Sequence, residues 1–139
     1  MRVLLINPNT NEEMTRAALD AGLKFKDSRT ELVGITNTSG PLSIEGYFDE
    51  VMTTPGVLEI IISEEGNYDA FIIACYSGHP AIIASREITA KPVVRPIYQR
   101  LPAWNRGLRD IAENIKKRDQ PTLYQSQCQR GPKAIRAPV

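Results

Sequence analysis

The sequence predicts an α/β fold, in which an open parallel sheet of about four strands carries helices on both faces. Short apolar runs at residues 2–7, 31–36, 69–74 and from 92 onward end in turn residues, which is typical of buried strands. The segments between them carry apolar residues at helical spacing or residues that start helices. Strands that alternate with helices in this way form right-handed βαβ units and therefore a parallel sheet.

The first part of the chain predicts two strands with a helix between them. After the run 2–7, Asn7 and Pro8 begin a tight loop. Thr10 and Glu13 have the spacing of a capping box, which predicts a helix over 11–23 with Thr10 as its cap. The apolar residues predicted for the inner face of this helix are Met14, Ala17, Ala18 and Ala21. The run 31–36 is then the second strand.

Two helices are predicted before the third strand, the first over 44–52 on a weak pattern. Thr54 and Pro55 suit the cap and first residue of a second helix, which ends at Gly66. The third strand covers 69–74. Pro80 opens a short helix to about Glu87, and the fourth strand begins at residue 92.

Length and composition describe one globular domain. The chain has 139 residues, of which 42% are hydrophobic and 24% charged. The N-terminal apolar stretch, residues 3–6, is too short for a secretory signal or a membrane span, so no membrane partner is expected. Two cysteines form no disulfide framework, which favours a reducing, cytoplasmic setting. No metal-ligand spacing and no phosphate-binding glycine motif is present, so no metal and no nucleotide is predicted.

The charge is divided between two stretches of the chain. Residues 1–94 hold 7 Lys and Arg against 13 Asp and Glu, whereas residues 95–139 hold 10 against 3. We expect a domain over 1–94 and a divergent basic tail over 95–139, with one helix at 104–118 and disorder in the remainder. The tail has no nucleic-acid-binding motif and no interleaved aromatic residues, so no nucleic-acid partner is predicted.

Cys75 is the leading candidate for chemistry, because it lies where an apolar strand gives way to a helix opened by Pro80. Backbone N–H groups and the positive end of a helix favour a thiolate, which could act as a base or nucleophile. The alternative is a small buried hydrophobic residue. His79 could pair with Cys75 as a dyad, but its place directly before Pro80 favours a helix cap or a loop-shaping role.

Polar loops are predicted to meet Cys75 at one edge of the sheet. In parallel sheets ligands bind beyond the carboxyl ends of the strands, where both the Asn7 loop and the Cys75 loop lie. The backbone N–H groups of Tyr76, Ser77 and Gly78 could hold a carboxylate or a developing enolate oxygen. Asn7 either contacts the ligand or only shapes its loop, and Ser43 lies in a third polar loop.

Three motifs in order resemble a known family. Residues 6–10 (INPNT), 40–46 (GPLSIEG) and 68–75 (YDAFIIAC) resemble the hydantoin racemase branch of the Asp/Glu racemase superfamily. The continuation 76–80 (YSGHP) is similar to fungal members of that branch. The resemblance covers residues 1 to about 94, which is two fifths to half of a complete member.

The resemblance implies one lobe of a two-lobed, cofactor-independent racemase or epimerase. In that family one cysteine removes a proton from the stereogenic carbon and a second cysteine returns one on the opposite face. By this resemblance Cys75 is the catalytic thiol of the first lobe. The implied substrate-binding residues are Asn7, Tyr76, Ser77, Gly78 and, with a weaker match, Ser43. The implied partner is a small molecule, namely a hydantoin, an amino acid or a related acid.

The chain departs from the family after Val94, where Arg95 and Pro96 follow and no second lobe is recognisable. Cys128 lacks the small-residue setting of the second catalytic cysteine. We therefore expect a truncated form of low or no activity, with a foreign or frameshifted tail. The alternative is a non-catalytic fragment or a small-molecule-binding α/β module. An exposed lobe face would favour self-association.

Overall fold

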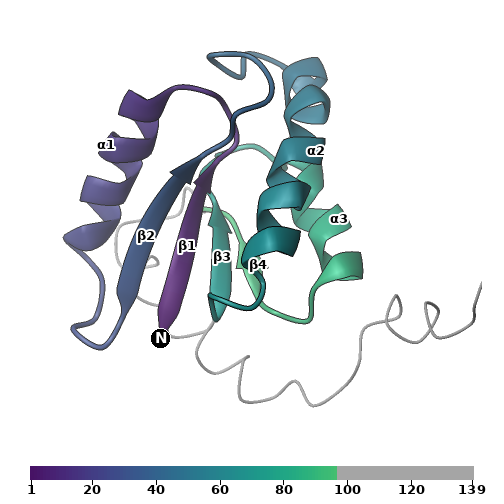
Figure 1. Ribbon diagram of the computed structural model, residues 1–139. Helices are drawn as coiled ribbons and strands as arrows, with labels where there is room; N and C mark the ends of the chain where they lie inside the picture. Colours follow the sequence, from purple (N-terminus) through teal and green to yellow (C-terminus); the bar gives the residue numbers. More distant parts are fainter. Residues whose placement is uncertain (97–139) are drawn as a thin grey trace, which may run out of the picture.

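The computed structural model describes residues 1–96, which form a four-stranded parallel sheet with three helices (Figure 1). In chain order the elements are β1 (Arg2–Asn7), α1 (Glu12–Leu23), β2 (Glu31–Thr36), α2 (Tyr47–Glu64), β3 (Ala70–Ile73), α3 (Pro80–Ile88) and β4 (Val93–Val94). The sheet order is β2-β1-β3-β4. The predicted α/β fold is confirmed. The predictions for the tail, including the helix at 104–118, lie outside the described residues.

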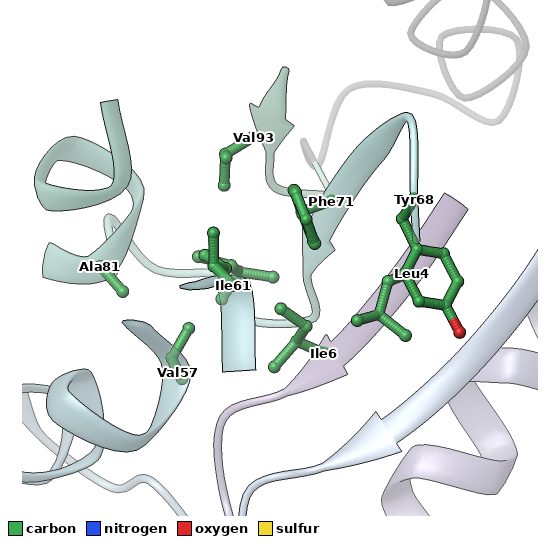
Figure 2. Close-up of a cluster of buried hydrophobic side chains, with 9 residues drawn as sticks. Leu4, Ile6, Val57, Ile61, Tyr68, Phe71, Ala81 and Val93 are labelled. Atoms are coloured by element: carbon green, nitrogen blue, oxygen red, sulfur yellow. The ribbon is translucent and has the colours of Figure 1, made fainter. Parts of the chain in front are cut away.

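One face of the sheet packs on α2 and α3. The register pairs Leu4 with Phe71 and Ile6 with Ile73, so alternate residues of neighbouring strands point to the same side. Figure 2 shows the resulting core, in which side chains from all these elements point toward one another. Its buried members are Leu4, Ile6, Val57, Ile61, Tyr68, Phe71, Ile73, Ala81 and Val93. Burial of these side chains fixes the distances of α2 and α3 from the strands.

The opposite face carries α1, which lies on the other side of the sheet from α2 and α3 (Figure 1). Gly34 in β2 allows this helix to approach closely, because a Cβ there would lie 3.3 Å from both Thr15 and Leu19. The inner face of α1 therefore consists of Thr15, Ala18, Leu19 and Gly22.

Two predictions for α1 are wrong. Its cap is Asn11, whose side-chain oxygen accepts from the N–H groups of Glu13 and Met14, while the Thr10 hydroxyl donates to the carbonyl of Pro41. The predicted inner face is shifted by one position, and Met14 is exposed. The shift has a physical reason, since Thr15 is needed inside to bond Asn7 and Thr36.

A single helix replaces the two predicted between the second and third strands. Pro55 lies in the interior of α2 instead of at a helix start. Proline removes one backbone donor from the helix. The hydroxyls of Thr53 and Thr54 both donate to the carbonyl of Glu50 in the same turn, which supplies hydrogen bonds beside the proline.

Candidate active site

The candidate site lies at the carboxyl edge of the sheet, between β1 and β3, where the strand order reverses. From β1 the chain passes through α1 on one face, whereas from β3 it passes through α3 on the other face. The loops after these neighbouring strands therefore diverge, which is the usual position of a ligand in such folds. The N–H of Ala74 donates to Ile6 O over 2.8 Å, so the two strands stay paired up to the point of divergence. The prediction that the Asn7 and Cys75 loops share this edge is confirmed.

Cys75 is half-buried and its sulfur has a close polar neighbour. Its Sγ lies 2.9 Å from the Oγ of Ser77, and its backbone N–H donates to Ile73 O over 2.8 Å. The side chain also packs against the edge of the main core. Either the thiol or the hydroxyl can donate in this contact. The arrangement suits a thiol that exchanges protons with a bound molecule.

His79 is fully buried and both of its ring nitrogens are occupied. Its Nδ1 accepts from the N–H of Ala81 and caps α3, and its Nε2 lies 2.9 Å from the hydroxyl of Thr53. Burial lowers the pKa of His79, and the nearby charge of Glu50 opposes this by raising it. The predicted cap is confirmed. A ring whose two nitrogens bond elsewhere does not act as the base partner of Cys75.

Asn7 is buried and organises its own loop. Its Nδ2 group lies within 3.0 Å of three acceptors, which are Asn9 Oδ1, Asn11 O and Thr15 Oγ1. Its Oδ1 accepts from the backbone N–H of Asn9. These bonds show the loop-shaping role directly, and a contact of Asn7 with a ligand stays a prediction.

The other predicted binding residues divide between two loops. Tyr76, Ser77 and Gly78 lie with Cys75, and a Cβ placed on Gly78 would meet no atom within 4 Å, so the space beside Gly78 is open. Ser43 lies in the loop between β2 and α2, where it is exposed and donates to Glu45 Oε1. Its loop is tied to the Asn7 loop because the N–H of Thr10 donates to Pro41 O over 3.1 Å.

The residues that join these loops were missed by sequence reasoning. Asn37 donates through Nδ2 to Pro8 O and to Thr53 O, so it joins the loop after β1 to α2. Its side chain is buried against Gly56, where a Cβ would lie 2.2 Å from Asn37 Oδ1. Asn37 directly follows a predicted strand, much as Asn7 ends one, and that signal could have found it. Thr53 had no such signal, because it was placed between two helices.

Residues 1–96 contain no group of three or more His, Cys, Asp or Glu side chains placed to hold a metal ion. Among the helices in this part of the chain, none is long and apolar enough to cross a membrane.

Comparison with known proteins identifies the family. The sequence profile of the Asp/Glu/Hydantoin racemase family matches residues 3–100. The chain belongs to this family. It is 45% identical over 95 residues to a hydantoin racemase of a Pseudomonas species, in an alignment that covers 68% of this chain and 38% of that protein. The structure of an allantoin racemase from Klebsiella pneumoniae superposes with a TM-score of 0.64 at 36% identity, over 68% of this chain and 39% of that one.

The chain spans about two fifths of the length of the curated racemases it matches. A longer alignment, with an uncharacterised protein of Schizosaccharomyces pombe, has 30% identity over 125 residues and covers 88% of this chain and 52% of that protein. This likeness therefore continues past the described residues. The predicted self-association stays a prediction. The first turns of α2 carry exposed apolar side chains, which are Tyr47, Phe48, Val51 and Met52.

Proposed function

We propose that the chain carries the Cys75 lobe of a cofactor-independent racemase or epimerase that acts on hydantoins, amino acids or their derivatives. Family membership supports an isomerase of this type. The observation that carries the proposal is the position of the Cys75 thiol at the carboxyl edge of the sheet, where the strand order reverses, beside the Ser77 hydroxyl. The relatives named for hydantoin and allantoin point to a five-membered cyclic ureide as the first substrate class to test.

The proposed chemistry is proton transfer at the carbon next to a carbonyl group. The Cys75 thiolate takes the proton and becomes a thiol, and the electron pair moves into the carbonyl to give an enolate. In this proposal the hydroxyl of Ser77, 2.9 Å from the sulfur, donates a hydrogen bond to the thiolate before the proton is transferred. The backbone at Tyr76, Ser77 and Gly78 is proposed to bind the enolate oxygen, because N–H groups fixed in a loop stabilise charge that develops there.

The other proposed binding residues shape the walls of the site. Asn7 holds the neighbouring loop in place through its three amide contacts and contributes to the substrate-binding surface. Ser43 lies farther out, in the exposed loop before α2, and is proposed to contact a substituent of the substrate.

Inversion at the carbon needs a second acid on the opposite face of the enolate. Within residues 1–96 Cys75 is the one cysteine, so this lobe supplies a base on one face. We therefore propose that the chain alone exchanges the α-proton with solvent faster than it racemises, because the same thiol can return a proton to the face from which it took one. Low or no racemisation is expected without a partner that supplies the second group.

Proton exchange in D2O tests this function. Purified full-length chain is incubated with 5-substituted hydantoins, allantoin and free amino acids, and deuterium incorporation and optical rotation are followed together. We expect deuterium incorporation into at least one cyclic ureide, with slower loss of optical rotation. Absence of exchange on every compound would reject the enzymatic function. Binding without exchange would support the alternative, a small-molecule-binding module.

A further inference from the structure

We propose that His79 is a positioning residue that fastens the Cys75 loop, residues 74–79, to α2, and that it does so only while its ring is neutral. This inference deepens the proposed function and rests on it for the identity of the reacting thiol. Three observations carry it: the two hydrogen bonds of the ring, the burial of the residues involved, and the connection onward to the other loops of the site.

The hydrogen bonds define which nitrogen carries the proton. The hydroxyl of Thr53 donates to Glu50 O over 3.0 Å, so toward His79 the same oxygen acts as acceptor. The ring must therefore donate from Nε2. At its other end Nδ1 accepts from the N–H of Ala81 over 3.2 Å, and an acceptor nitrogen carries no proton. The contacts thus specify one tautomer of a neutral imidazole.

A second proton on the ring would break the cap of α3. It would sit on Nδ1 and face the N–H of Ala81, so two donors would oppose each other in a buried setting. His79 and Thr53 are both 0% exposed, and no water replaces the lost bond without rearrangement. The charged group whose field reaches the ring is Glu50 of α2, while the other contacts of the ring, Thr53 and Ala81, are uncharged. Protonation and the fastened loop therefore exclude each other.

The bond to Thr53 connects the Cys75 loop to the rest of the site. The carbonyl of Thr53 accepts from Asn37 Nδ2, and the same amide group donates to Pro8 O in the loop after β1. The methyl group of Thr53 faces Gly40, where a Cβ would lie 2.6 Å from it. Gly40 has a φ of +118°, so its backbone conformation also favours glycine. One buried chain of contacts thus sets the three loops relative to one another.

Two substitutions at Thr53 separate the hydroxyl from the packing. Thr53→Val keeps the methyl group against Gly40 and removes the acceptor for Nε2, whereas Thr53→Ser keeps the acceptor and removes the methyl group. His79→Asn is a third variant, because asparagine still caps a helix but is too short to reach Thr53. All are made with Cys128→Ser, which leaves Cys75 as the one thiol in the chain.

Alkylation by iodoacetamide reports the state of the loop and requires no racemase activity. We expect Thr53→Val and His79→Asn to be alkylated about tenfold faster at pH 7.5, which corresponds to about 1.4 kcal/mol, because a released loop exposes the half-buried sulfur. Thr53→Ser should keep the parent rate. Circular dichroism checks that each variant is folded. Parent-like rates in both Thr53→Val and His79→Asn would overturn the proposal, even if proton exchange were observed.

The pH dependence separates positioning from a purely structural role. As the pH falls below about 6.5, the usual pKa of histidine, the parent chain should approach the alkylation rate of His79→Asn, because the parent alone has a ring to protonate. A ratio of the two rates that stays constant between pH 7.5 and 5 would contradict the proposal.

The tautomer is open to direct measurement, because His79 is the chain's one histidine and its ring signals are unambiguous. Imidazole 15N NMR at pH 7.5 should show the proton on Nε2, and a proton on Nδ1 would overturn the assignment. If alkylation and NMR behave as expected while proton exchange is absent, the proposed function fails and the positioning role stands.

Discussion

Gly56→Ala will destabilise the protein, although alanine is the better helix former. Inside a helix this change ordinarily stabilises by up to about 1 kcal/mol. Here the new Cβ would lie 2.2 Å from Asn37 Oδ1. Asn37 moves aside only by losing buried hydrogen bonds with Pro8, Thr53 and Ser39, each worth about 1 kcal/mol. The expected net loss is about 2 kcal/mol in the free energy of unfolding, or about 6–12 °C in Tm.

Urea unfolding followed by circular dichroism measures this loss. Gly66→Ala is the matched control, because a Cβ at Gly66 meets no atom within 4 Å, and we expect a change of less than about 0.5 kcal/mol. Repeating Gly56→Ala in an Asn37→Ala background removes the group it strikes, so the cost should largely disappear. Two results would contradict this explanation. One is a Gly56→Ala protein as stable as the parent, and the other is an equal loss in the free energy of unfolding when Gly56→Ala is made in the Asn37→Ala background.

Three further substitutions test other contacts of the site. Ser77→Ala should slow both alkylation of Cys75 and proton exchange by about 3–10-fold, because the thiolate loses its hydroxyl donor. Unchanged rates would argue against a hydrogen bond from Ser77 to the sulfur. Burial lowers the pKa of His79, so its contribution to the free energy of unfolding is complete above the unfolded-state pKa of about 6.5 and falls as the pH drops through the folded-state pKa. Urea titrations at several pH values should therefore show that the free energy of unfolding depends less on pH in His79→Asn than in the parent. An equal pH dependence in the two proteins would contradict this. Asn7→Asp should lower the free energy of unfolding by about 3 kcal/mol, because a carboxylate replaces the donor that serves three acceptors, and parent-like thermal unfolding would count against this role.

The sheet was predictable because its strands are apolar on both faces and end in turn residues. The run at 69–74 is an example, since every residue of β3 is buried. The inward-facing side of α1 and the start of α2 were less predictable. The period of α1 was correct but its phase was wrong, because the polar Thr15 faces inward to hydrogen-bond and a hydrophobic pattern does not register it. Pro55 signalled a helix start, although it lies inside the continuous helix α2.

The site was predictable in its loops and less so in its connections. Asn7 ends β1 and Cys75 follows the neighbouring β3, and parallel topology alone brings such positions to one edge. His79 was predictable as a cap from Pro80, but its bond to Thr53 depends on how α2 packs against α3. That packing joins residues 26 positions apart, which no local spacing reveals.

We propose Cys75 as the proton-transfer group, and α-deuterium exchange in matched cysteine variants is the direct test. Exchange into the cyclic ureide found most reactive is measured for the parent chain, Cys75→Ser and Cys128→Ser, with the uncatalysed rate subtracted. We expect Cys75→Ser to lose at least about 100-fold in exchange rate, because general-base catalysis is lost, and Cys128→Ser to keep the parent rate. Parent-like exchange in Cys75→Ser would contradict the account.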